Sequence, residues 1–138
     1  MNWHLILRLS LLSIVMGFAS VLGLTRSYEW LVWLCVGLMC AWQFAKKTRE
    51  ELFLHGFYVG IFIGIFNSAI QAVFISMYLS NNPGMVEALN ALPQNLHPAA
   101  VILIMGPIIG AFSGVVFGLL AAVTGKLLHS QISDSPSS

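Results

Sequence analysis

The sequence predicts an all-α integral membrane protein, a bundle of four transmembrane helices. Of its 138 residues, 58% are hydrophobic and only 8% are charged, whereas soluble domains are typically about 45–50% apolar. Four apolar stretches are each long enough to cross a hydrocarbon core of about 30 Å, and they cover about residues 5–24, 28–45, 52–79 and 99–126. We therefore expect residues 1–129 to form one four-helix transmembrane domain, and the Ser-rich residues 130–138 to be a disordered polar tail.

The distribution of positive charge predicts the orientation in the membrane. Lys and Arg near span ends stay preferentially in the cytoplasm, and here they gather at one set of ends: Arg8, Lys46, Lys47, Arg49 and Lys126. Arg26 alone lies on the other side. With an even number of spans, both termini are predicted to be cytoplasmic, and the protein is expected in the inner membrane of a cell.

Aromatic and loop residues fit the same orientation. Trp and Tyr rings favour the two membrane interfaces; Trp3 and Trp42 are predicted at the inner one, and Tyr28, Trp30, Trp33 and Tyr78 at the outer one. On the outer side, the turn signal Asn81-Asn82-Pro83-Gly84 is followed by apolar residues at helical spacing, Met85, Val86, Leu89 and Leu92. This spacing predicts a short helix lying on the outer surface.

The strongest pattern is a strip of small residues at every fourth position in each of the last two spans. The third span carries Gly56, Gly60, Gly64, Ser68, Ala72 and Ser76, and the fourth carries Gly106, Gly110, Gly114, Gly118 and Ala122. Helices in lipid associate through close backbone contact, which small residues permit. The strips therefore predict helix packing, either of the third span on the fourth within one chain or against another copy or another subunit.

Polar residues inside the spans are few. No Asp, Glu, Lys or Arg lies near the middle of a span, where transport and proton-relay proteins keep ionisable groups. Asn67 and Gln71 lie on one face of the third span and flank Ser68. They are predicted either to hold helices together through hydrogen bonds or to form a polar binding or permeation site.

No catalytic residue, metal site or cofactor is predicted. The segment Gly110-Ala111-Phe112-Ser113-Gly114 superficially matches the nucleophile motif of rhomboid proteases, but Ala111 replaces the first glycine and no His lies at membrane depth to act as the base. His4, His55, His97 and His129 all fall at span ends, where contact with headgroups and water is expected. A net charge of +1 without clustered Lys and Arg excludes nucleic acid as a partner.

One arrangement of residues resembles a known family. The basic turn Lys46-Lys47-Thr48-Arg49-Glu50-Glu51 leads into His55-Gly56-Phe57-Tyr58-Val59-Gly60, and the long third span leaves through Asn82-Pro83. This layout is similar to that of small bacterial four-helix membrane proteins known only as a domain of unknown function. The resemblance implies a fold and no activity.

Two functions follow as expectations. The first is a non-enzymatic bundle that acts through helix contacts, as a homo-oligomer or as an accessory subunit of a membrane complex. The alternative is a channel or facilitator for a small solute, lined by Asn67, Gln71 and Ser68. The expected partners are the lipid bilayer and other membrane chains.

Overall fold

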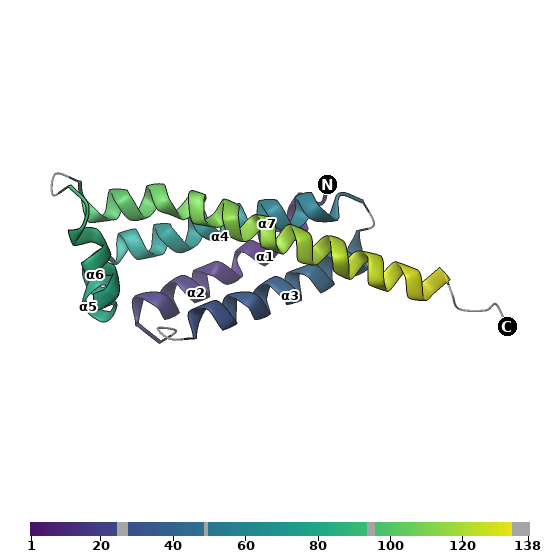
Figure 1. The fold of residues 1–138 in the computed structure, drawn as a ribbon, viewed down its shortest axis with the longest axis horizontal. Helices are drawn as coiled ribbons and strands as arrows, with labels where there is room; N and C mark the ends of the chain where they lie inside the picture. The colour runs from purple at the N-terminus through teal and green to yellow at the C-terminus, as the bar shows by residue number, and fades with distance from the viewer. Residues whose placement is uncertain (25–27, 49, 94–95, 134–138) are drawn as a thin grey trace.

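The computed structural model describes residues 1–24, 28–48, 50–93 and 96–133, and these form seven helices and no strand. In chain order the helices are α1 (Trp3–Ser10), α2 (Leu12–Val21), α3 (Glu29–Lys47), α4 (Leu52–Val73), α5 (Ile75–Asn81), α6 (Pro83–Asn90) and α7 (Pro98–Ser133). The long helices run lengthwise beside one another, and α5 and α6 lie across one end of the bundle (Figure 1). The N-terminus and the C-terminal end of α7 lie toward the opposite end.

Three helical segments of the described chain are long and apolar enough to cross a membrane. They are Trp3–Val21, which combines α1 and α2, Leu52–Val73 and Pro98–Leu128. The predicted second span, α3, is not among them, because Glu29, Gln43 and two lysines lower its hydropathy. The prediction of an all-helical chain with apolar spans is therefore confirmed. Within the described residues, three helical segments, not the four predicted, are long and apolar enough to be spans.

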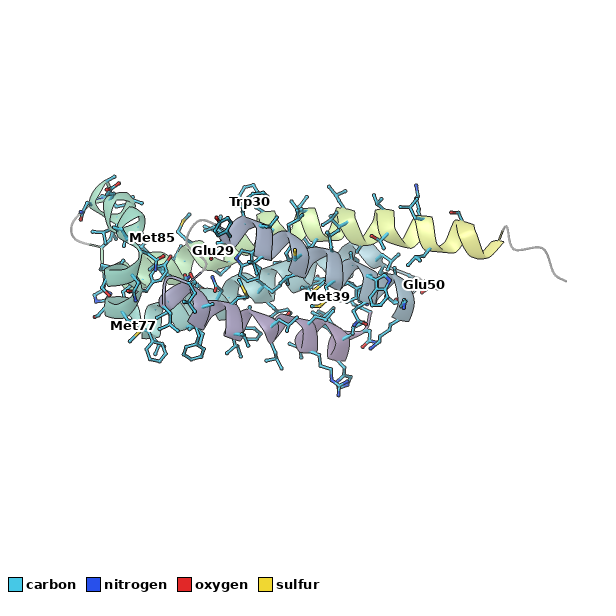
Figure 2. All side chains as sticks on the ribbon, turned by 90° about the horizontal axis from the view of Figure 1, so that it is seen from below. Glu29, Trp30, Met39, Glu50, Met77 and Met85 are labelled. Carbon is cyan, nitrogen blue, oxygen red and sulfur yellow. The ribbon has the colours of Figure 1, made fainter. Side chains whose placement is uncertain are left out.

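Apolar side chains cover the outside of the bundle along its length (Figure 2). Phe112 is 74% exposed, Val15 69% and Ile104 66%. Soluble monomers rarely expose apolar surface on this scale. Such a surface is typical of a protein that lies in lipid.

The first span is interrupted at Leu11, between α1 and α2. The Ser13 hydroxyl donates to the Ser10 carbonyl (2.6 Å) and competes for the acceptor that Ile14 N–H would use in a regular α-helix. Ile14 N–H bonds the Leu11 carbonyl instead (3.0 Å), which tightens this turn. The two serines thus explain where the helix is broken.

The predicted third span, 52–79, is wrong at its outer end. The helix α4 stops at Val73 because Phe74 leaves the helical conformation (φ −102°, ψ 34°), and a separate helix, α5, begins at Ile75. Tyr78 in α5, predicted near the outer interface, is buried in a small cluster with Val21 and Ile102. The predicted short helix after Pro83 is present as α6.

The last helix is longer than the predicted span. α7 continues through Pro107 and ends at Ser133, so residues 130–133 of the expected disordered tail are helical. At 1.5 Å per residue its 36 residues extend about 54 Å, well beyond the thickness of a hydrocarbon core. Residues 134–138 of the tail, and Arg26 and Arg49 of the charge pattern, lie outside the described residues.

The two strips of small residues face each other within the chain. A Cβ atom on Gly56 would lie 2.5 Å from the backbone nitrogen of Gly118, and one on Gly110 would lie 2.7 Å from the carbonyl oxygen of Gly60. A Cβ atom on Gly60 would overlap the backbone of Gly114. The antiparallel helices α4 and α7 therefore touch backbone to backbone, which a methyl group at these positions would prevent.

Smaller contacts attach α2 and α3 to this pair. Gly37 of α3 lies under the Phe117 ring of α7, where a Cβ atom would be 2.5 Å from the ring. Gly17 of α2 faces Ile70 of α4. Apolar side chains fill the space between the helices at the end that holds the N-terminus: Leu5, Ile6, Leu9, Cys40, Ala41, Phe44, Val59, Ile63, Phe117 and Ala121.

His55 is buried (1% exposed), contrary to the prediction that the histidines contact headgroups and water. The backbone N–H of Asn2 donates to Nε2 (2.9 Å), so Nδ1 carries the proton and donates to the carbonyl of Glu51 (2.8 Å). The ring also packs against Phe44. Because both ring nitrogens are hydrogen-bonded, the histidine can be buried at little cost and joins α1 to the start of α4.

We predict that Gly60→Ala lowers the free energy of unfolding by about 3 kcal/mol, because the added methyl group must push α4 away from α7. SDS titration of the purified protein measures this change. Gly84→Ala is the matched control, since a Cβ atom there meets nothing within 4 Å, and it should change stability by no more than about 1 kcal/mol. Equal effects of the two substitutions would contradict the close contact.

Candidate functional site: a cavity between α4, α6 and α7

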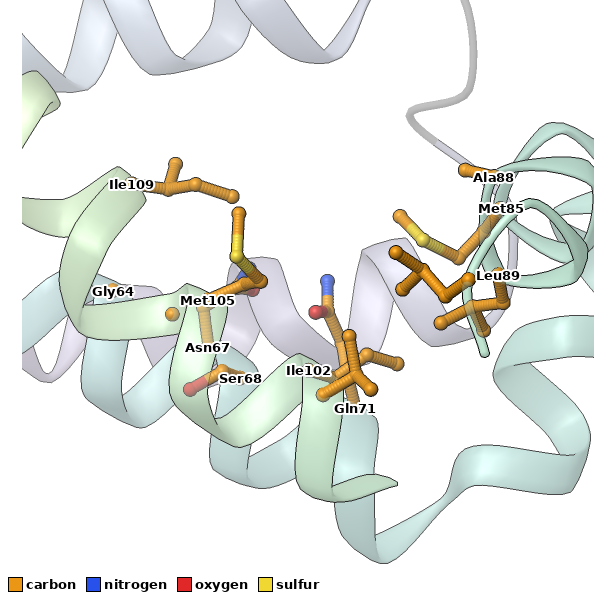
Figure 3. A pocket seen from close by; sticks show the side chains of 13 residues that line it. Gly64, Asn67, Ser68, Gln71, Met85, Ala88, Leu89, Ile102, Met105 and Ile109 are labelled. Atoms are coloured by element: carbon orange, nitrogen blue, oxygen red, sulfur yellow. The ribbon is translucent and has the colours of Figure 1, made fainter. Parts of the chain in front are cut away.

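A cavity of about 370 Å³ lies beside the end of the α4–α7 contact, under α6. Figure 3 shows Met105 and Ile109 of α7 on one side of it, opposite Met85 and Leu89 of α6. Its volume is in the range of small-molecule sites, which are commonly about 300–1,000 Å³. The remaining lining residues are Gly64, Asn67, Ser68, Gln71, Ala88, Leu92, Val101, Ile102 and Gly106.

The structure brings the predicted polar residues together at this cavity. Asn67, Ser68 and Gln71 all line it from α4 and are the polar residues among its lining residues. Gly64 and Gly106 line it too and are the last glycines of the backbone contact, to which Gly56, Gly60, Gly110, Gly114 and Gly118 also belong. The cavity therefore begins where the close contact of α4 and α7 ends.

Two of the three polar side chains are hydrogen-bonded within the protein. Gln71 Nε2 donates to the Ser20 hydroxyl of α2 (3.1 Å), and the Ser68 hydroxyl donates to the Ile65 carbonyl (3.1 Å). Gln71 thus forms a hydrogen bond between helices, which is one of the two interpretations that the sequence left open. It fixes the position of α2 behind the cavity.

Asn67 differs from both neighbours. Its Oδ1 atom is buried and has no hydrogen-bond partner among the described residues. This oxygen lies against Gly17, where a Cβ atom would be 3.3 Å away. A buried acceptor without a donor costs about 1–3 kcal/mol. Few polar groups in folded proteins stay unpaired in this way, so Asn67 stands out among the residues of the wall.

Two residues that anchor the outer end of α2 were not recognised from the sequence. The side-chain amides of Asn81 and Asn82 donate to the carbonyls of Val21 and Ser20, both at 3.0 Å. Both carbonyls lie at the end of α2, where the last carbonyls lack the usual helical partners; the Ser20 carbonyl also accepts from the backbone N–H of Gly23 (3.0 Å). The sequence indicated only a turn at Asn81-Asn82, because a contact between residues 60 positions apart leaves no local signal.

The α6 wall is the least tightly held part of the site. No residue of α6 is buried, and the helix packs mainly against α5. A second hollow, of about 280 Å³, shares Leu89, Leu92 and Val101 with the cavity. The apolar spacing that predicted α6 includes Met85, Leu89 and Leu92, so the sequence indicated this face but not what it covers.

None of the lining residues is ionisable. Within the part of the chain that the structure describes, no three His, Cys, Asp or Glu side chains come together as a group that could hold a metal ion. The cavity can therefore offer apolar contact and amide hydrogen bonds. No general acid, base or nucleophile with a partner is present on its wall.

No family model, no curated protein and no solved structure matches this chain. The resemblance to the small bacterial four-helix proteins stays a prediction. The chemistry and geometry of the site itself therefore indicate the function.

We predict opposite effects for the two amides of the site. Asn67→Leu should raise the free energy of unfolding by about 1 kcal/mol, because it removes a buried acceptor that has no donor. Gln71→Leu should lower it by about 0.6–1 kcal/mol, because it breaks the bond to Ser20. Thermal unfolding in one mild detergent compares both with the parent. Destabilisation by Asn67→Leu as large as that by Gln71→Leu would mean that Asn67 has a partner.

Proposed function

We propose that this protein is a four-span protein of the bacterial inner membrane, with both termini cytoplasmic and α3 as the fourth span. Its 19 residues correspond to about 28 Å, close to the thickness of a hydrocarbon core. α3 packs against α7 beside the three more apolar segments. Its polar residues lie near its ends, where Lys46 also stacks over the Trp42 ring (3.7 Å).

Within this framework, we propose that the protein binds a small, mostly apolar molecule from the outer half of the bilayer and has no enzymatic activity or cofactor. One observation carries the proposal: the three polar residues that the sequence singles out line the same apolar cavity. A few polar groups in an apolar pocket are typical of ligand sites, because they orient a ligand that the apolar walls attract.

The contact between α4 and α7 favours binding over conduction. Below the cavity, Gly60 meets Gly114 and Gly64 meets Gly110 without side chains between them. A solute that entered beside Asn67 would therefore meet backbone atoms instead of a path between these helices. The channel interpretation would require α4 and α7 to separate.

We expect Ala88→Trp to lower the affinity for an apolar fluorescent probe, 1-aminoanthracene, by at least about tenfold, because the indole would fill the cavity from α6. The titration uses protein in phosphatidylcholine nanodiscs, with empty nanodiscs as the background. Ala91→Trp is the matched control, since Ala91 lies three residues further along and does not line the cavity. If neither substitution changes the affinity, the probe binds elsewhere or not at all, and the proposed site is refuted.

Association with a second copy or another membrane subunit is a second proposal, and it now requires a surface other than the glycine strips. The end of α7 provides one. Gly125 lies against Leu52, the first residue of α4, so residues 126–133 extend about 12 Å beyond that helix. Leu127 is 62% exposed on this extension.

Leu127→Ala removes an exposed apolar side chain from the proposed partner surface. In native membranes it should at least halve the fraction of protein that a lysine-reactive cross-linker joins to another chain. Lys47, which is exposed, supplies a reactive amine near the same end. Ser80→Ala, at the opposite end of the bundle, should leave the fraction unchanged. Unchanged cross-linking in Leu127→Ala would remove the support for this partner surface.

A further inference from the structure

The hydrogen-bonding groups on the cavity wall differ in what they can still bind. Ser68 has used its one donor on Ile65, and Gln71 has used one N–H on Ser20. Asn67 has a whole amide left, because its Oδ1 makes no hydrogen bond among the described residues. A ligand that matches this wall must bring a polar group for the Asn67 amide, and a hydroxyl can both accept from Nδ2 and donate to Oδ1.

The position of Asn67 allows that bond. The residue lines the cavity while its Oδ1 atom lies at the back, against Gly17 of α2. Nδ2 is the other end of this amide; it is not among the buried unpartnered atoms and makes no hydrogen bond among the described residues, so it is left to bond a ligand. Gln71 is the next polar residue along the wall, one helical turn away. Figure 3 shows its amide in the space between Met105 and Leu89.

The rest of the wall determines the charge and the body of the ligand. No ionisable residue lines the cavity, so nothing there would compensate a charged headgroup removed from water. Met85, Leu89, Met105 and Ile109 provide an apolar surface from two helices. Met side chains adapt to irregular apolar shapes, which suits a flexible chain.

From these observations we infer that the ligand is a neutral, lipid-like molecule: an apolar chain that carries one hydroxyl or amide group, which hydrogen-bonds to the side-chain amide of Asn67. This inference rests on the proposed binding function and adds the chemical class of the ligand. It distinguishes an uncharged alcohol or amide from a plain alkane and from an ionised fatty acid.

The test uses two photoreactive probes that differ by one group: a twelve-carbon alcohol with a diazirine on its chain, and the corresponding alkane. Protein in phosphatidylcholine nanodiscs is irradiated with each probe, and mass spectrometry locates the labelled residues. Labelling of Met85 and Met105 is expressed relative to the exposed Phe112 of α7, which reports the lipid background. We expect the alcohol to exceed the alkane by about tenfold at the cavity residues.

Two variants test whether the preference for the alcohol over the alkane depends on Asn67. Asn67→Leu should label equally with both probes, whereas Gln43→Leu, which removes an amide from α3 outside the cavity, should keep the preference for the alcohol. A third probe, the corresponding dodecanoic acid with the same diazirine, is ionised at pH 9 and should label the cavity no more than Phe112. The comparison of probes on the parent protein is decisive even if a variant fails to fold.

Different outcomes would refute the inferred headgroup and the proposed binding function. Equal labelling of the cavity by alcohol and alkane would overturn the inferred headgroup but leave the cavity as a binding site. Labelling that never rises above that of Phe112, with either probe, would overturn the binding function itself. Preferential labelling by the ionised acid would replace the neutral headgroup with an anionic one.

Discussion

The backbone contact between α4 and α7 is the constraint on which the rest of the structure depends. Helices in lipid gain no hydrophobic energy by associating, so their attraction comes from short distances between many atoms. Gly60 and Gly114 allow that distance because neither has a side chain. Once these two helices are in contact, α2 can pack on one of them through Gly17, and α3 on the other through Gly37.

The same contact determines where a ligand can bind. The glycine strip ends at Gly106, which faces the hydroxyl of Ser68, and both residues are on the cavity wall. The break at Phe74 then turns the chain across the end of the bundle and brings α6 over the opening. The position at which the small residues stop therefore divides the bundle into a tightly packed part and a part that contains the cavity.

Local patterns in the sequence predicted the features that depend on spacing along one helix. The four-residue period of glycine predicted packing, and Asn67 and Gln71 were placed on one face correctly. Contacts between distant segments could not be predicted in this way: burial of His55 requires the backbone of Asn2, and the cavity requires α6 to lie near α7. The sequence also left open whether the strips meet within one chain, which periodicity cannot decide.

Solid-state NMR of the protein in liposomes tests the central contact most directly. With ¹³C-labelled glycine, our account predicts Cα–Cα cross-peaks that join Gly60 to Gly114 and Gly64 to Gly110. These cross-peaks should persist when labelled chains are diluted with unlabelled ones. Their absence, or their loss on dilution, would show that the strips do not meet within one chain and would contradict the account.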